Sequence, residues 1–103
     1  MSKFLGFLGL TKKSGNLIEG YNKCEEYMKR KKPYLLILAK EASPNTIKKF
    51  TTFCKEEEIP FIDGIDKKIL GEALGREEIN ILFVKDNKMA KKLLDLWDEE
   101  NLR

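Results

Sequence analysis

The chain has 103 residues, of which 42% are hydrophobic and 36% are charged, and it contains no histidine. This hydrophobic content is sufficient for one compact core and argues against a disordered chain. The lack of histidine removes the commonest general base and excludes Ser-His, Cys-His and histidine–metal sites. We therefore expect a single domain over residues 1–103 that has no metal site, no cofactor and no enzymatic activity.

Charge is distributed unevenly along the chain. Residues 1–49 carry 11 Lys and Arg against 4 Asp and Glu, a net charge of +7, whereas residues 50–103 carry 9 against 13, a net charge of −4. A basic region on a neutral-to-acidic body attracts a phosphate backbone and leaves the remaining surface unattractive to it. The distribution favours a nucleic-acid partner.

The first residues are not typical of a secretory signal. The apolar stretch of residues 4–10 is short, contains two glycines and has no small-residue cleavage site after it. No apolar run approaches the length of a membrane span, so we expect a cytoplasmic protein without a membrane partner. Cys24 and Cys54 lie far apart without histidine neighbours, which predicts free, buried or half-buried thiols.

Apolar residues at helical spacing predict the first two helices. The first begins behind Ser2, which can cap it, and stops at Ser14-Gly15. After the very short apolar pair Leu17-Ile18, the second helix begins at Tyr21 and ends in the basic run of residues 29–32. Cations at that position suit the negative end of the helix dipole.

Two unbroken apolar runs, residues 34–39 and 79–84, predict strands that are buried on both faces. A short third strand is expected at Phe61-Ile62. Ser43-Pro44 predicts the start of a third helix, with a buried face made of Ile47, Phe50, Phe53 and Cys54.

Two more helices complete the pattern. Asp66 caps a short one that ends at Gly75, and its inward residues are Ile69, Leu70, Ala73 and Leu74. Asp86 opens the last one, and its buried face is Met89, Ala90, Leu93, Leu94 and Trp97. Residues 98–103 are expected to fray. Because helices and strands alternate and two strands need cover on both faces, we predict an α/β fold, a three-layer α-β-α sandwich with a small four-stranded mixed sheet.

The segment Thr11–Asn22 places paired lysines, two glycines and a helix start close together. Lys12 and Lys13 can neutralise backbone phosphate, and Gly20 lets a polynucleotide approach the main chain. Free N–H groups at the start of the second helix can bind phosphate, while Asn22 and Lys23 can reach base edges.

Each of these features also has an ordinary structural explanation. Ser14-Gly15 can be a helix stop, Gly20 a turn residue and Asn22 a cap, and the basic run 29–32 can be a solvated helix end. Gly71 can serve close packing. Arg76, in an exposed loop after Gly75, is a further candidate for binding. The clustering of the candidates favours a functional role.

Four stretches form a series: Leu8–Gly15, Gly20–Lys23, Leu35–Thr46 and Leu70–Gly75. In this order and at this spacing they resemble the L7Ae/L30e family of ribosomal proteins, most closely its short bacterial members, often called YlxQ-type. The resemblance covers roughly residues 4–97 as judged by motif order. It implies an α-β-α sandwich that binds kink-turn RNA in a ribosome-associated role.

The resemblance also implies where the RNA lies. In the family, a helix N-terminus enters the bent groove at tandem G·A pairs, and a second loop covers an extruded nucleotide. The groove-reading residues correspond by position to Gly20, Asn22, Lys23 and Glu26, and the covering loop to Leu74, Gly75 and Arg76. The full set of candidate RNA-binding residues is Lys12, Lys13, Gly20, Tyr21, Asn22, Lys23, Glu26, Lys40, Leu74, Gly75 and Arg76.

This chain departs from the family pattern in the second helix. Family members commonly carry lysine where it has Glu26, and often an acidic residue or glutamine where it has Lys23. The local charge is thus partly inverted. A carboxylate that faces phosphate is repelled, although salt screens the effect, so the departure bears on kink-turn affinity and leaves the fold unaffected.

The partners expected from the resemblance are structured RNA and the ribosome or its assembly factors, and we expect a monomer. One alternative is a protein-interaction domain that has kept the fold and lost the RNA site, using the acidic second half or the region of Trp97. A small enzyme has least support, because Glu19, Glu41 and Asp63 are better explained as caps and solvated surface.

Overall fold

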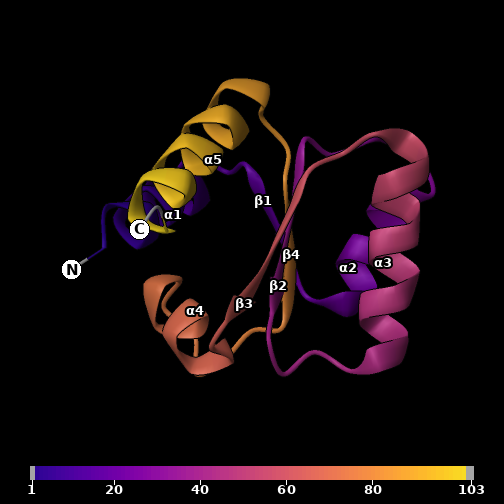
Figure 1. Ribbon diagram of the computed structural model, residues 1–103, viewed down its shortest axis with the longest axis horizontal. Helices are drawn as coiled ribbons and strands as arrows, with labels where there is room; N and C mark the ends of the chain where they lie inside the picture. The colour runs from indigo at the N-terminus through magenta and orange to yellow at the C-terminus, as the bar shows by residue number, and fades with distance from the viewer. Residues whose placement is uncertain (1, 102–103) are drawn as a thin grey trace.

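The computed structural model describes residues 2–101, which form helices on both faces of one sheet (Figure 1). The elements in chain order are α1 (Lys3–Lys13), β1 (Leu17–Glu19), α2 (Tyr21–Met28), β2 (Leu35–Ala39), α3 (Pro44–Glu57), β3 (Phe61–Ile65), α4 (Lys67–Ala73), β4 (Ile81–Val84) and α5 (Asn87–Asn101). None of these helices combines the length and apolar character needed to cross a membrane.

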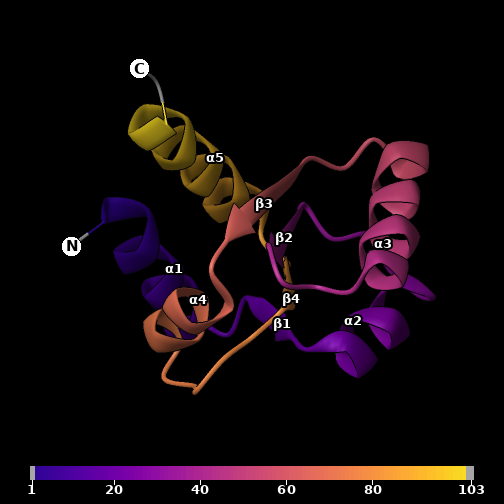
Figure 2. The same cartoon turned by 60° about the horizontal axis from the view of Figure 1, so that its bottom comes forward.

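The sheet is mixed and has four strands in the order β1-β4-β2-β3. Strand β4 is antiparallel to β1 and β2, whereas β3 is parallel to β2. Helices α1, α4 and α5 cover one face of the sheet, and α2 and α3 cover the other, as both Figure 1 and Figure 2 show. The predicted three-layer sandwich is confirmed, and the apolar pair Leu17-Ile18 belongs to the edge strand β1.

Strands β2 and β4 are buried along their whole lengths, as their apolar runs predict, but they are shorter than predicted: residues 79–80 precede β4, and Tyr34 precedes β2 and is exposed. Successive side chains point to opposite faces of a strand, so each run serves two cores. Leu35, Ile37 and Leu82 pack under α1, α4 and α5. Leu36 and Phe83 pack under α2 and α3, where Phe83 lies 5.9 Å from the ring centroid of Phe50.

The predicted helix caps are confirmed. Ser2 Oγ accepts a hydrogen bond from the Leu5 N–H at 3.1 Å, and Ser43 Oγ accepts one from the Thr46 N–H at 3.2 Å, with Pro44 at the first helical position. The Asp66 carboxylate accepts bonds from two N–H groups of α4, and these bonds lower its pKa. Each side chain satisfies donors that the start of a helix leaves free.

Helix α2 ends earlier than the sequence predicts. Its last residue is Met28, and the basic run 29–32 lies in the turn that follows it. The N–H groups of Arg30 and Lys31 both donate to the Tyr27 carbonyl, at 3.0 and 2.9 Å. Pro33 keeps the helix from resuming after this turn, because proline disfavours helical backbone in the residue before it. The prediction of cations inside the last helical turn is therefore wrong.

The predicted inward faces of α4 and α5 are partly wrong. Ile69 is 50% exposed rather than buried, because the short helix α4 turns Leu70 to the core. In α5 the fully buried stripe is Ala90, Leu93 and the unpredicted Leu96. The predicted residues Met89, Leu94 and Trp97 pack at its margins and are half-buried.

The expected fraying of residues 98–103 is also wrong as far as Asn101. Helix α5 continues to that residue because Glu100 is fixed to the start of α1. Its carboxylate accepts hydrogen bonds from Ser2 Oγ at 2.6 Å and from the Phe4 N–H at 3.0 Å, which lower its pKa. Residues 102 and 103 lie outside the described range.

Cys24 and Cys54 are free and fully buried among the residues between the sheet and helices α2 and α3. Burial raises the pKa of each thiol to about 12. Both groups therefore stay protonated near neutral pH and act as small apolar side chains. The prediction of free buried thiols is confirmed.

Candidate nucleic-acid interface

Helix α2 begins with backbone donors that have no partner within the helix. Gly20 is its N-cap residue, with φ 96° and ψ 158° and no side-chain cap. The first hydrogen bond that closes a helical turn runs from the Cys24 N–H to the Gly20 carbonyl at 3.0 Å. The N–H groups of residues 21–23 precede it and remain at the positive end of the helix dipole.

The Gly20 conformation is available almost only to glycine. It lets the chain leave strand β1 and begin α2 in one step, while the Gly20 N–H still donates to the Ile81 carbonyl at 2.9 Å. The helix start is thus held at the first residue of β4. The predicted role of Gly20 as a turn residue is confirmed, and its predicted contact with RNA remains a prediction.

The loop that follows α4 lies next to the start of α2. Gly75, with φ 71°, follows the helix, and the Arg76 N–H donates to the Gly71 carbonyl at 2.8 Å. A second bond, from the Gly75 N–H to the Glu72 carbonyl at 3.2 Å, completes a Schellman motif. Gly75 ends the helix as predicted and places Arg76 at the surface.

Gly71 allows this loop to lie against α4. A Cβ atom at residue 71 would lie 2.5 Å from Glu78 Cα, 2.8 Å from Glu78 N and 3.0 Å from the Arg76 carbonyl oxygen. These are backbone atoms that cannot rotate away. The predicted close-packing role of Gly71 is confirmed.

Glu19 joins three segments next to the start of α2. Its carboxylate pairs with Lys12 at 3.3 Å and with Arg76 at 3.1 Å, and its side chain is only 13% exposed. Lys12 also donates to the Leu74 carbonyl at 2.6 Å. Glu19 thereby holds the end of α1 and the Arg76 side chain, a role that the expectation of a solvated carboxylate missed.

The start of α2 and the Arg76 loop border a shallow groove of about 440 Å³. The loop between β2 and α3 forms its third side. The Asn80 Oδ1 atom of this groove is buried and has no hydrogen-bond partner within residues 2–101. The groove is lined by Gly20, Tyr21, Glu41, Ala42, Ser43, Thr46, Arg76, Glu78, Ile79, Asn80 and Ile81.

Tyr21 is fixed at the edge of the groove by α3. Lys49 Nζ donates to the Tyr21 hydroxyl at 3.1 Å, and it also pairs with Glu25. This pairing lowers the pKa of Glu25 and raises the pKa of Lys49. The Tyr21 ring packs edge-on against Phe50, with the ring centroids 5.4 Å apart. Sequence reasoning did not identify Lys49.

The remaining candidate residues do not all reach the groove. The Leu74 side chain is 3% exposed and belongs to the core, so only the backbone of Leu74 can take part in the predicted covering loop. Lys13 lines a separate groove between α1 and α4. Lys40 is exposed directly before the groove residue Glu41.

Lys23 and Glu26 line another groove, of about 400 Å³, along the side of α2. Glu26 pairs there with Arg30 at 3.2 Å. Both side chains are more than 70% exposed, and such pairs contribute little to stability. The pair nevertheless keeps Arg30 beside Glu26, the carboxylate that stands where the proteins resembled in sequence commonly have lysine.

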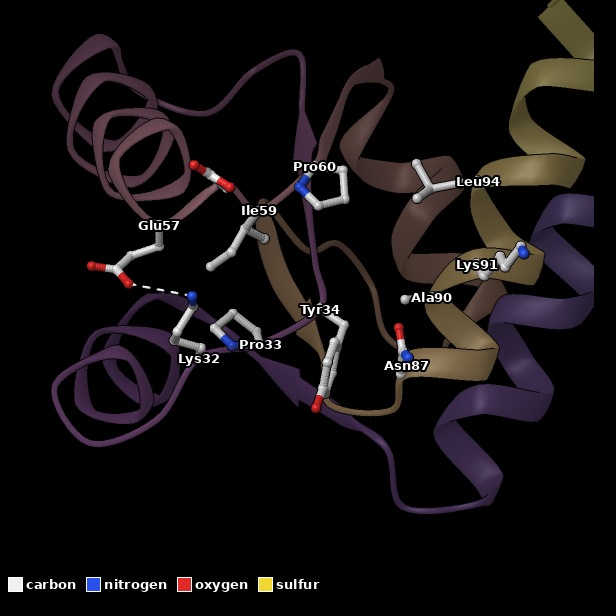
Figure 3. A pocket seen from close by; sticks show the side chains of 11 residues that line it. Lys32, Pro33, Tyr34, Glu57, Ile59, Pro60, Asn87, Ala90, Lys91 and Leu94 are labelled. Carbon is white, nitrogen blue, oxygen red and sulfur yellow. Dashed lines mark ion pairs between the residues drawn. The ribbon is translucent and has the colours of Figure 1, made fainter.

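A large cavity, of about 570 Å³, lies at the other end of the sheet (Figure 3). It is bordered by the turn before β2, the turn before β3 and the first half of α5. The ion pair between Lys32 and Glu57, at 3.5 Å, lies at its edge. None of the candidate RNA-binding residues lines it.

The fold and the series of sequence stretches define a family. Residues 2–94 match the ribosomal protein L7Ae/L30e/S12e/Gadd45 family, and the chain belongs to it. The resemblance found in the sequence is confirmed. RNA-binding protein YlxQ of Bacillus subtilis strain 168 is 29% identical over 91 residues, which are 88% of this chain and 91% of YlxQ.

Two solved structures share the architecture. A Bacillus halodurans protein of unknown function has a TM-score of 0.89 and 30% identity over 95% of this chain and 99% of its own. The Giardia lamblia 15.5kD RNA binding protein has a TM-score of 0.72 over 89% of this chain and 85% of its own, at 18% identity. The second match shows the fold alone.

Proposed function

We propose that this protein is a non-catalytic RNA-binding protein that recognises kink-turn or similarly bent RNA in a ribosome-associated role. The observation that carries the proposal is the groove that joins the open N-terminus of α2 to the Arg76 loop. Membership of the L7Ae/L30e/S12e/Gadd45 family and the relation to RNA-binding protein YlxQ support it.

The groove offers donors for phosphate and for base edges. The N–H groups of residues 21–23 lie at a helix N-terminus, which favours anions. Asn22 and Lys23 are exposed on the first turn and can donate to base acceptors. Arg76, across the groove, can bind phosphate through two N–H groups.

The proposal is tested by titrating the protein with a fluorescent kink-turn RNA and with an unbent duplex of equal length. We expect the kink-turn to bind at least about tenfold more tightly, because contacts to shape and base edges add to the sequence-independent phosphate contribution. Equal, weak binding of both RNAs would contradict it.

Substitutions in the first turns of α2 refine the same titration. Lys23→Ala is expected to weaken kink-turn binding by about 1–3 kcal/mol if it contacts a base. Glu26→Lys should strengthen binding by about 1 kcal/mol, because it replaces a repulsion with an attraction at a screened surface. Lys68→Ala, on the opposite face of the sheet, is the control. If Glu26→Lys leaves the affinity unchanged, position 26 does not face the RNA.

A protein-interaction domain is the second candidate function. The observation in its favour is the groove between α1 and α4, in which Leu10 and Ile69 are 56% and 50% exposed. This candidate predicts that neither RNA binds above the nonspecific level.

A further inference from the structure

The two ends of the sheet differ in charge. Among the residues that line the groove at the start of α2, Arg76 is a cation and Glu41 and Glu78 are carboxylates. At the other end, the turn 29–32 contributes four consecutive cations, and the large cavity beside it adds Lys91 against Glu57 and Glu58. The lining of the groove at the start of α2 therefore carries more carboxylates than cations, and the run of four cations lies away from it.

The dipole of helix α2 does not explain why four cations follow the helix. A helix dipole attracts cations only at its last turn, and α2 ends at Met28, so only Lys29 is close enough. Within residues 2–101, Arg30 and Lys32 form ion pairs, with Glu26 and Glu57, whereas Lys29 and Lys31 form none. Four adjacent like charges repel one another, so the folded chain gains little from them.

The basic turn is connected to the groove at the start of α2. The groove along the side of α2 is lined at one end by Lys23 and at the other by Arg30 and Lys31. Helix α2 has eight residues, which span about 12 Å at the helical rise. An RNA strand that leaves the helix start can therefore reach Lys31 along an open groove whose charged residues are Lys23, Glu26, Arg30 and Lys31.

An exposed aromatic ring lies beyond the basic turn. Tyr34 is 48% exposed and lines the large cavity together with Lys32 and Lys91. Figure 3 shows its ring between Pro33 and Asn87, with the hydroxyl directed away from the cavity centre. Tyrosine beside lysines is the combination on which unpaired bases stack while the backbone is neutralised.

We propose that the turn 29–32 and the adjoining Tyr34 and Lys91 form a second RNA-contact surface, which holds the backbone of the RNA that continues past the bend. The inference rests on the proposed function and extends it. RNA bound at the start of α2 follows the side of that helix, and Lys29 and Lys31, which have no ion pair to break, bind its phosphates.

The test compares two double variants with equal loss of charge. Lys29→Gln/Lys31→Gln removes the free cations of the basic turn, and Lys3→Gln/Lys68→Gln removes two exposed lysines from α1 and α4. Each variant and the unmodified protein are titrated over a salt series with a kink-turn core alone and with the same core carrying a long flanking stem or an unpaired extension.

With an extended RNA, we expect Lys29→Gln/Lys31→Gln to reduce the slope of log K against log salt by about 1.4–1.8, since each phosphate contact contributes about 0.7–0.9. The control variant should keep the slope. With the core alone, the two variants should bind alike. A difference between the variants that appears only with the flanking stem would show that the bound flanking RNA is paired. A difference that appears only with the unpaired extension would show that it is unpaired.

Three results would overturn the inference. If the unmodified protein binds the core and both variants match on extended RNA, the second surface fails and the proposed function stands. If the basic-turn variant loses as much affinity for the core as for extended RNA, Lys29 and Lys31 act by long-range electrostatic attraction and do not contact the flanking strand. If no RNA binds, the proposed function fails as well.

Discussion

Gly71→Ala is expected to lower the free energy of unfolding by about 2–3 kcal/mol, at the upper end of the range for overpacked sites. The added Cβ atom would lie 2.5 Å from Glu78 Cα and 2.8 Å from Glu78 N. Because these are backbone atoms, the loop that carries Arg76 must move as a whole. The change therefore also weakens kink-turn binding, and urea denaturation with a parallel titration measures both effects.

Gly6→Ala is the matched control for this change. Gly6 also lies inside a helix, but nothing lies within 4 Å of a Cβ atom placed there. Alanine should stabilise the protein at this exposed helical position by about 0.5–1 kcal/mol. Equal stabilities of the Gly71→Ala and Gly6→Ala variants would show that the loop does not pack closely against residue 71.

Gly20→Ala is expected to cost about 1–3 kcal/mol of stability and to reduce kink-turn affinity at least about tenfold. The backbone at Gly20 lies in a region that other residues almost never occupy, although space around it is open. The strain is relieved only if the chain turns differently before Tyr21. That movement displaces the three free N–H groups and takes the first turn of α2 out of the groove.

Gly15→Ala is the matched control that separates the effect of backbone strain from the effect on RNA binding. Gly15 also has a positive φ, 80°, and an open environment, and it closes the Schellman motif at the end of α1. Its replacement should cost about 1–2 kcal/mol and leave the affinity of the folded protein for RNA unchanged. A loss of affinity equal in both variants would show that global stability, rather than the geometry at Gly20, controls binding.

The fold could be predicted because local signals agree with the layers. Ser2, Ser43 and Asp66 mark helix starts by their capping chemistry, and the unbroken apolar runs of β2 and β4 require cover on both faces. Strand β1 gave a weaker signal. It has three residues, all half-buried, and pairs with a strand more than 60 residues away in the sequence.

Two of the wrong predictions, for α4 and α5, concern which side of the helix faces the sheet. Ile69 and Leu70 are adjacent and equally apolar, and only the packing of α4 decides which of them is buried. The same holds for Leu96 in α5. The end of α5 was misread because Glu100, a charged residue near a terminus, gives no sign of its bonds to the start of α1.

The candidate site could be predicted only for those residues that lie together in one segment of the chain. Gly20, Asn22 and Lys23 follow one another at a helix start, and Gly75 ends a helix as glycine commonly does. Glu19 was missed because it pairs with Arg76, 57 residues away. Lys49 was missed for the same reason, since it reaches Tyr21 from a different helix.

We expect RNA to occupy the groove between the start of α2 and the Arg76 loop. The most direct measurement is a titration of the ¹⁵N-labelled protein with kink-turn RNA, followed by amide chemical shifts. We expect the largest shifts at residues 20–23 and 75–80, with small shifts along α1 and α5. Shifts concentrated in the groove between α1 and α4, or no shifts at the start of α2, would contradict the account.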